Sequence, residues 1–147
     1  MKKVIAVVVM SLFLAGVAFA GGTADEAKAL IEKGVAEMKA SGKDKAFADF
    51  SDTKGRFVDR DLYIFVIDTT GMTLAHGGNP KLVGKDMSEL KDADGKFFIK
   101  DIIAFAKGNA EGWVDYKWTN PVSKKAEPKS CYVKQIDNLI FGCGIYK

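Results

Sequence analysis

The chain of 147 residues is long enough for one domain, and its charge is nearly balanced, with 22 basic against 19 acidic residues and a net charge of +3. Lys2 and Lys3 belong to a predicted leader, and their removal leaves 20 basic against 19 acidic residues, a net charge of +1. Such a small excess gives no basis for predicting a nucleic-acid partner or an electrostatic membrane partner.

Residues 1–20 have the pattern of a secretory signal peptide. Two lysines precede an apolar stretch over residues 4–19, which ends in Ala18-Phe19-Ala20 before two glycines. The alternative is an uncleaved membrane anchor, but an apolar core of roughly 15 residues is short for a bilayer span. We therefore expect export to the periplasm or the cell exterior, no membrane span after cleavage, and one folded domain over residues 24–147.

Two helices are predicted at the start of the mature chain. Thr23-Ala-Asp-Glu26 has the form of a capping box, and apolar residues recur behind it at helical spacing through residues 24–40. Gly42 ends this long helix. A second, shorter helix is predicted over residues 44–50.

The most informative stretch is a predicted β-hairpin over residues 61–76. Residues 62–67 are an unbroken run of apolar residues, mostly β-branched or aromatic, and Asp68-Thr-Thr-Gly71 offers the residues that a tight turn needs. Because the run shows no polar alternation, we expect a central strand that is covered on both faces. The loop that follows, His76-Gly-Gly-Asn-Pro80, lets a ligand approach the main chain.

The rest of the chain supplies a crossing segment and three more strands. Residues 77–107 are predicted to cross the sheet, with a helical turn at 86–90 and a helix at 97–107. Strands are predicted at 112–118, 129–135 and 139–146, with a solvated loop at 119–128. This order indicates an α+β domain with one five-stranded antiparallel sheet, a long N-terminal helix and helices packed mainly on one face.

Strand alternation assigns side chains to faces. Over residues 112–118, Val114, Tyr116 and Trp118 share one face of the strand. Trp113 and Lys117 lie on the other face, so the two tryptophans are predicted to point in opposite directions.

Two cysteines, Cys131 and Cys143, lie on the last two predicted strands, around a turn at Asp137-Asn138. A three-residue turn places them directly opposite each other and allows a disulfide, which suits an oxidising compartment. A two-residue turn puts the sulfur atoms on opposite faces. The sequence leaves both registers open, and neither cysteine belongs to a Cys-x-x-Cys motif.

Catalytic and metal sites find little support. The chain has one histidine, and no serine or cysteine has an evident partner for nucleophilic catalysis. Asp92, Asp94 and Gly95 match only the start of a calcium loop. A haem iron bound by His76 is an alternative, but the sequence has no Cys-x-x-Cys-His motif for covalent haem attachment. We expect no enzyme, no cofactor and no metal.

The aromatic and hydroxyl groups of the chain give more information about function than any catalytic motif does. The strands carry six large polar or amphipathic aromatic residues: Tyr63, Trp113, Tyr116, Trp118, Tyr132 and Tyr146. Ligand pockets are mainly apolar with a few convergent polar groups, and a cation at such a pocket selects an anion. Core packing explains each aromatic residue equally well by itself, so only the group indicates a binding site.

Several segments together, in this order, resemble the single Cache domain of the Cache_2 type. They are residues 61–68 (Asp-Leu-Tyr-Ile-Phe-Val-Ile-Asp), 76–85 (from His76-Gly-Gly-Asn-Pro), 112–121 (from Gly-Trp-Val-Asp-Tyr), 127–133 (Glu-Pro-Lys-Ser-Cys-Tyr-Val) and 142–146 (Gly-Cys-Gly-Ile-Tyr). The resemblance covers roughly residues 24–146. It implies an extracytoplasmic PAS-like sensor fold with a pocket between the sheet and the crossing segment.

The resemblance also implies a function and a set of ligand contacts. Cache domains commonly sense small molecules for chemoreceptors and histidine kinases, so we expect a small organic anion such as acetate, propionate, pyruvate or lactate. By analogy, the pocket residues are expected to be Tyr63, His76, Tyr116, Trp118, Lys129 and Tyr132, with Arg60 and Lys117 as further candidates for a carboxylate.

We expect the chain to differ from receptor members of the family in having no second membrane helix and no signalling module. It therefore resembles a free-standing exported form, whose expected partners are a membrane receptor or kinase, or a second copy of itself. The alternative is an interaction module of the cell envelope with a vestigial pocket.

Overall fold

A computed structural model describes residues 20–147, so the predicted signal peptide, apart from Ala20, lies outside the described residues. The helices and strands are, in chain order, α1 (Ala24–Ser41), α2 (Lys43–Ser51), β1 (Val58–Asp59), β2 (Leu62–Tyr63), β3 (Phe65–Asp68), β4 (Thr73–His76), the 3₁₀ helix η1 (Pro80–Leu82), α3 (Phe98–Gly108), β5 (Glu111–Thr119), β6 (Ala126–Ile136) and β7 (Leu139–Tyr146).

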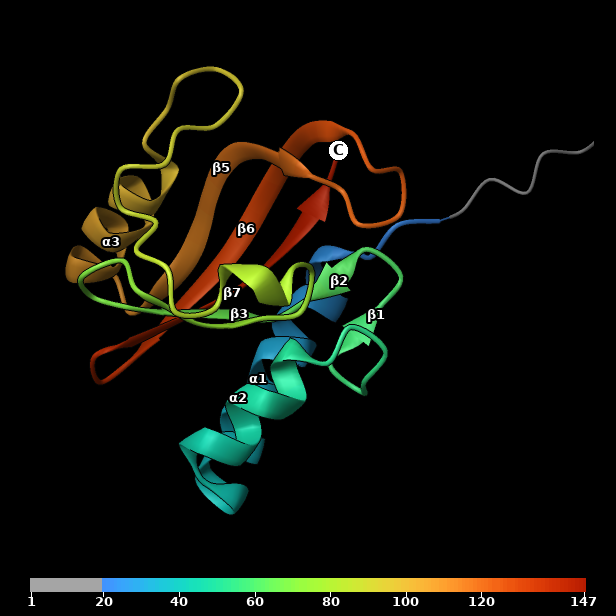
Figure 1. Cartoon of the computed structure of the whole chain (residues 1–147), viewed down its shortest axis with the longest axis vertical. Helices are drawn as coiled ribbons and strands as arrows, with labels where there is room; N and C mark the ends of the chain where they lie inside the picture. Colours follow the sequence, from blue (N-terminus) through green and yellow to red (C-terminus); the bar gives the residue numbers. More distant parts are fainter. Residues whose placement is uncertain (1–19) are drawn as a thin grey trace, which may run out of the picture.

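The centre of the fold is a five-stranded sheet with the strand order β4-β3-β7-β6-β5 (Figure 1). Each neighbouring pair in this sheet is antiparallel. A separate short hairpin, β1–β2, precedes it. The predicted α+β class with a five-stranded antiparallel sheet is confirmed.

Helix α1 begins at the predicted capping box. The Glu26 amide donates to Thr23 Oγ1 at 3.3 Å, and the Thr23 amide donates to Glu26 Oε2 at 2.8 Å. These bonds satisfy two amides that the first turn leaves without helical partners. The helix ends before Gly42, whose φ of 86° suits glycine and allows α2 to start at once in a new direction.

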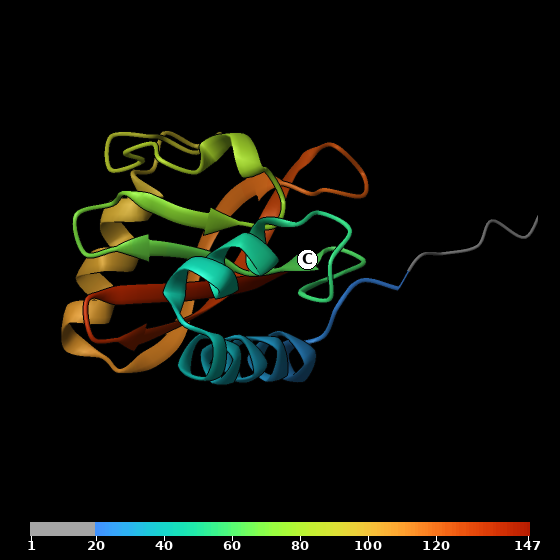
Figure 2. The ribbon, with the colours of Figure 1, turned by 60° about the horizontal axis from the view of Figure 1, so that its bottom comes forward.

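Two hydrophobic cores lie on opposite faces of the sheet. Helices α1 and α2 cover one face, and α3 with the crossing segment covers the other (Figure 2). Ile64 and Val66 belong to the core beneath α1 and α2, whereas Phe65 and Ile67 belong to the core beneath α3. This alternation explains why residues 62–67 contain no polar position: both faces of this stretch are buried.

The predicted strand over residues 62–67 is interrupted at Ile64. Residues before the break pair with β1 around a two-residue turn at Arg60-Asp61, and those after it form β3. Arg60 adopts a positive φ of 58° in this turn. The sequence analysis missed this hairpin because β1 is only two residues long.

Two other predicted segments also differ. Residues 86–90 do not form a helical turn, because Asp86 instead bridges to Met72 and caps the Ser88 amide at 2.8 Å. Strands β5 and β6 extend to Thr119 and from Ala126, so the predicted loop at 119–128 is shorter.

The turn between β6 and β7 has two residues. Ile136 pairs with Leu139, and Asp137 takes a positive φ of 53°. In this register Cys143 pairs with Tyr132 rather than with Cys131, so the two thiols are buried in different cores and both are free. The register that would allow a Cys131–Cys143 disulfide is not the one adopted.

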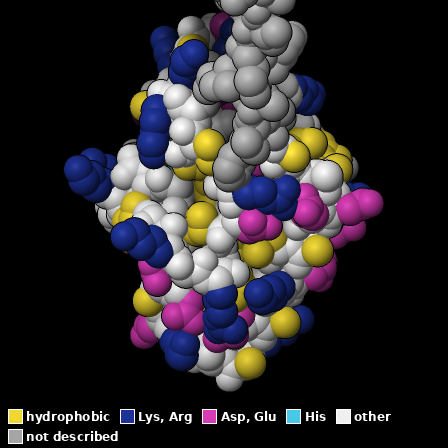
Figure 3. Space-filling view, turned by 90° about the vertical axis from the view of Figure 1, so that its right-hand side faces the viewer, with side chains coloured by type: hydrophobic (Ala, Val, Ile, Leu, Met, Phe, Trp, Pro, Cys, Tyr) yellow, Lys and Arg dark blue, Asp and Glu magenta, His cyan; other side chains and the backbone are white. Residues whose placement is uncertain are grey.

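The outer surface carries charges of both signs. On the face seen in Figure 3, basic and acidic side chains are interspersed, with hydrophobic side chains between them. Within residues 20–147, no helix is long and apolar enough to cross a bilayer.

Candidate functional site

A small cavity lies between the sheet and α3. Its volume is about 20 Å³, which is room for about one water molecule. Its walls are mostly apolar and come from β2 to β5, the crossing segment and α3. The lining residues are Tyr63, Phe65, Ile67, Thr73, His76, Met87, Phe98, Ile99, Tyr116 and Trp118. We call this space the inner cavity.

Strand register brings the aromatic walls together. Phe65 pairs with His76 across β3 and β4, and their rings stack with centroids 6.0 Å apart. On the far wall, Phe98 at the start of α3 stacks on Tyr116, with centroids 4.6 Å apart, and contacts Trp118 at 5.1 Å. The predicted pairing of Tyr116 and Trp118 on one face of their strand is therefore observed, and that face is the one toward α3.

Lys129 is the one buried lysine among the described residues. Its side chain is 1% exposed, and its ammonium donates to the Tyr63 hydroxyl at 2.9 Å. Nζ also lies 4.4–5.7 Å from four ring centroids, those of Tyr63, Phe65, Tyr116 and Tyr146. Within residues 20–147, no carboxylate lies within 4.0 Å of it.

An unpaired buried ammonium is costly, since charges inside proteins are normally paired. Contacts with aromatic faces compensate in part. Only one of the three Nζ donors has a hydrogen-bond partner among the described residues. Lys129 thus places unmatched positive charge one hydrogen bond behind Tyr63, a residue of the cavity wall.

Hydroxyl groups extend from this lysine in a chain. The Tyr63 hydroxyl lies 3.4 Å from that of Tyr146, which donates to the Thr119 carbonyl at 2.9 Å. Burial raises the pKa of Tyr63, Tyr116 and Tyr146 above the ordinary phenol value. All three phenols therefore stay protonated and act as hydrogen-bond donors at neutral pH.

His76 is a neutral donor. It is 6% exposed, and burial, with the positive charge of Lys129, lowers its pKa to about 3. Its Nδ1 accepts from the Asn79 amide at 2.9 Å, so the single ring proton is on Nε2. Among residues 20–147, no group accepts from Nε2. The imidazole of this cavity-lining residue therefore keeps one N–H that has no acceptor among the described residues.

A second, wider pocket adjoins the inner cavity. Its volume is about 190 Å³, and it shares Tyr63 and Trp118 with the inner cavity. The other lining residues come from the loop after β4 and from the β5–β6 loop: Gly78, Asn79, Thr119, Pro121 and Lys124. We call this space the outer pocket. Tyr63 and Trp118 therefore form the wall between the two spaces, and Trp118 is partly exposed.

The structure brings five predicted site residues together: Tyr63, His76, Tyr116 and Trp118 line the inner cavity, and Lys129 lies behind Tyr63. The predicted placement of Tyr132 is wrong. Tyr132 packs on Trp113 on the opposite face of the sheet, and its hydroxyl donates to Glu111 at 2.6 Å. Side chains alternate along a strand, so Lys129 and Tyr132, three positions apart, cannot share a face.

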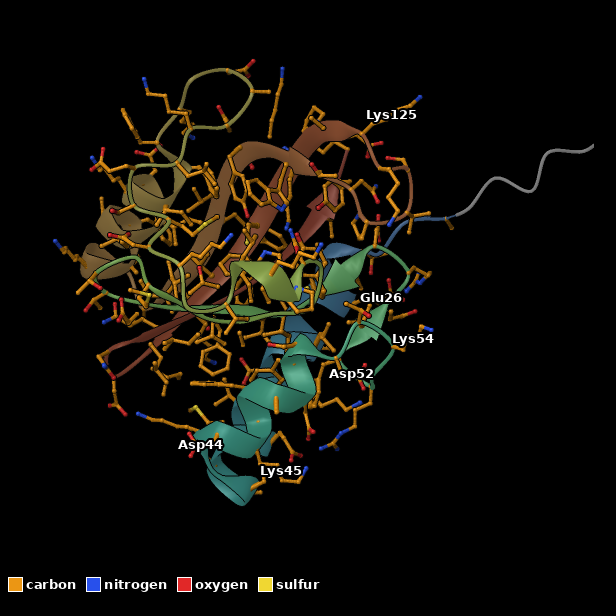
Figure 4. The ribbon with its side chains drawn as sticks, in the orientation of Figure 1. Glu26, Asp44, Lys45, Asp52, Lys54 and Lys125 are labelled. Carbon is orange, nitrogen blue, oxygen red and sulfur yellow. The ribbon has the colours of Figure 1, made fainter. Side chains whose placement is uncertain are left out.

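Arg60 and Lys117 also lie outside the inner cavity. Arg60 lies at the β1–β2 turn and pairs at 2.8 Å with Glu26. Glu26, labelled in Figure 4, belongs to the first turn of α1. Lys117 points away from the inner cavity and pairs with Asp94 at 3.0 Å. Arg60 and Lys117 were predicted as ligand contacts because they lie near strand ends in the sequence. Such nearness does not determine where a side chain points.

Several wall residues escaped the sequence analysis. Phe65 and Ile67 share the strand alternation of Tyr63, so the signal for them was present. Thr73 was hidden by a β-bulge between Ile67 and Val66, where β4 holds Leu74 as an extra residue. Without the bulge, Thr73 and His76 would face opposite sides of the sheet.

The partial calcium motif has a structural explanation. Asp92 Oδ1 accepts from the amides of Asp94 and Lys96, and Asp92 Oδ2 accepts from the Lys117 amide at 3.0 Å. The aspartate therefore caps a turn and ties the crossing segment to β5. Among residues 20–147, no cluster of His, Cys, Asp and Glu could hold a metal ion.

The sheet, the long N-terminal helix and a cavity between sheet and crossing segment define a PAS-like α+β domain. The family model of single Cache domain 2 matches residues 4–146, and the chain belongs to this family. The resemblance seen in the sequence is thus confirmed.

The chain is similar to proteins of bacterial signalling. It is 30% identical over 90 residues to the methyl-accepting chemotaxis protein McpP of Pseudomonas putida, which is 60% of this chain and 16% of McpP. The match therefore spans about a sixth of that relative.

Solved structures agree in fold. A methyl-accepting chemotaxis protein from Vibrio parahaemolyticus has a TM-score of 0.72 at 28% identity, over 83% of this chain and 86% of the other. A Cache chemosensory domain solved for carboxylic acid recognition has a TM-score of 0.66 at 24% identity, over 81% and 84%.

Proposed function

We propose that the protein is a periplasmic sensor-type domain that binds a short organic anion, with the ligand carboxylate held near Lys129. The observation that carries this proposal is the burial of Lys129 without a carboxylate partner among the described residues. An anion from solution supplies the missing negative charge. In a site of low dielectric constant, this attraction is much stronger than at the surface.

The groups around Lys129 suit a carboxylate. The ligand oxygens accept hydrogen bonds from His76 Nε2–H and from the hydroxyls of Tyr63 and Tyr116, and Lys129 adds charge behind Tyr63. Charge-assisted hydrogen bonds of this kind are about twice as strong as neutral ones. The remaining walls, including Phe65, Phe98 and Ile99, exclude water and contact a short apolar tail.

The dimensions of the site restrict the ligand to a few carbon atoms. The inner cavity has room for about one water molecule, so binding requires Trp118 or Met87 to move outward and open the wall toward the outer pocket. The carboxylic acid recognition of a solved Cache domain supports testing this class first. McpP is a methyl-accepting chemotaxis protein, and we propose a membrane receptor or kinase as the partner that responds to the bound state.

One observation favours a second candidate function. The small volume of the inner cavity is also what a vestigial pocket would show, in a domain that serves as an interaction module of the cell envelope. In that case, the aromatic walls only complete the core beneath α3.

Thermal unfolding with a panel of acids separates the two candidates. A ligand at about 100 times its dissociation constant stabilises the folded state by about 2.7 kcal/mol. We expect acetate, propionate, pyruvate or lactate to raise the melting temperature by several degrees, and succinate to have no effect because the site offers one buried cation. A panel without any stabilising acid would contradict the proposal and favour the interaction module.

A further inference from the structure

We infer that Thr73 binds a second oxygen atom of the ligand, so that the site prefers short carboxylates with a hydroxyl or carbonyl group at the end remote from the carboxylate. The inference rests on the proposed function and specifies its ligand. It concerns the end of the inner cavity opposite to Lys129, where the walls are otherwise apolar.

The Thr73 hydroxyl is unpaired. It is the one buried side-chain oxygen or nitrogen atom within residues 20–147 that has no hydrogen-bond partner, and the residue is 2% exposed. Thr73 lines the inner cavity beside Ile67, Met87 and Ile99. A buried hydroxyl without a partner destabilises the folded state, whereas valine has the same shape and no such cost.

Folding alone gives no reason for a hydroxyl here. The Thr73 amide donates to the Lys85 carbonyl at 2.9 Å, and the Thr73 carbonyl accepts from the Gly84 amide at 2.8 Å. The main chain therefore fixes the end of β4 without help from the side chain. A ligand oxygen in the cavity is the partner that the hydroxyl lacks.

The sheet register sets the distance between the two polar ends of the site. Thr73 pairs with Ile67, and His76 pairs with Phe65, two residues away on β3. Two strand residues correspond to about 7 Å along the sheet. The bulge at Leu74 turns both side chains toward the same cavity. With bonds of about 1.5 Å, an extended chain of about four carbon atoms covers such a distance.

The test compares butyrate with 4-hydroxybutyrate by calorimetric titration of the wild-type protein, Thr73→Val and Thr73→Ser. We expect wild type to bind 4-hydroxybutyrate about three- to tenfold more tightly than butyrate, the effect of one added hydrogen bond. Thr73→Val removes this preference, so that it binds the two acids with about equal affinity. Thr73→Ser keeps a hydroxyl and keeps the preference.

Each outcome bears on a definite claim. Equal affinities for the two acids in wild type, or the same preference in wild type and Thr73→Val, overturn the role of Thr73 while leaving carboxylate binding intact. Failure of wild type to bind either acid, or any acid of the panel, overturns the proposed function as well. Without ligand, Thr73→Val should unfold at the same temperature as wild type or at a higher one, because an unpaired hydroxyl is removed. A lower unfolding temperature would show that the hydroxyl has a structural partner, and it would contradict the inference.

Discussion

Lys129 combines two properties that seldom occur together in one side chain. It is almost completely inaccessible, and among the described residues it pairs with a phenol and aromatic faces rather than with a carboxylate. Stability alone does not explain it, because an apolar side chain of similar length avoids the desolvation of an ammonium. We propose that anion binding explains it.

Replacement of Lys129 separates binding from stability. We expect Lys129→Met to weaken binding of a carboxylate about 30-fold or more, since removal of a buried charge partner costs about 2–5 kcal/mol. The free protein should be equally stable or more stable by about 1–4 kcal/mol. Titration calorimetry and urea unfolding measure the two effects.

Lys117→Met is the matched control. Lys117 lies on the neighbouring strand, with a side chain that is 38% exposed and paired with Asp94. Its loss should leave binding unchanged and alter stability by less than about 1 kcal/mol. Undiminished carboxylate binding by Lys129→Met would show that Lys129 is not the anchor.

His76 makes the stability of the domain depend on pH. Its pKa is about 3 in the folded state and about 6.5 in the unfolded chain, so between these values only the unfolded state binds the proton. Stability is therefore complete above about pH 6.5 and decreases as the pH falls toward 3.

Urea unfolding at about pH 7.5 and about pH 5 tests the role of His76. Wild type should lose about 2 kcal/mol between these conditions through this one group. His76→Asn, whose amide oxygen can accept from Asn79 in place of Nδ1, should lose much less. An equal loss in both proteins would mean that His76 is not the group that titrates.

Among the elements, β7 determines how the site is built. Its sequence Gly142-Cys-Gly144 places two residues without side chains on the cavity face of the central sheet. A Cβ at Gly144 would lie 2.2 Å from Lys129 Cε, and one at Gly142 would lie 2.1 Å from the Phe65 ring. Lys129 on β6 and Phe65 on β3 flank β7. Because the two glycines have no side chains, the side chains of Lys129 and Phe65 can lie over β7.

Gly144→Ala should displace Lys129. We expect a loss of stability of about 1–3 kcal/mol from overpacking and a loss of carboxylate affinity of about tenfold or more. Gly108→Ala at the end of α3 is the control, because a Cβ there meets no atom within 4 Å. Thermal unfolding and titration measure both changes. Wild-type affinity in Gly144→Ala would show that the position of Lys129 is not critical.

At the scale of the whole molecule, patterns carried by several residues were predictable. The capping box fixed the start of α1, the unbroken apolar run indicated a central strand with two covered faces, and strand alternation paired Tyr116 with Trp118. Each of these three predictions depends on a periodic pattern or on a local hydrogen bond, and residues close together in the sequence determine both.

Some features depend on whether a strand or turn contains one additional residue, and these features were not predictable. The two-residue turn at Asp137 separates the thiols, the break at Ile64 creates an additional hairpin, and the bulge at Leu74 brings Thr73 beside the cavity. The turn length and the bulge each shift the pairing by one position, and such a shift changes which side chains share a face of the sheet. Tertiary packing decides such shifts, so five of eight candidate site residues were placed together and three were not.

The two hydrophobic cores on opposite faces of the sheet differ in composition. The core beneath α1 and α2 consists of apolar packing and holds the sheet, whereas the core beneath α3 contains Lys129, His76 and the unpaired Thr73 hydroxyl. Within residues 20–147, these three buried polar groups, each with an unused hydrogen-bonding capacity, lie on the same face of the sheet. We infer that binding energy from a ligand, rather than folding, accounts for their presence.

The most direct test of this account is a calorimetric comparison of propionate with propionamide, which share shape and size but differ in charge. The account predicts that wild type binds propionate at least about tenfold more tightly than propionamide, because only the carboxylate matches the charge of Lys129. Equal affinities, or binding of the amide alone, would contradict it.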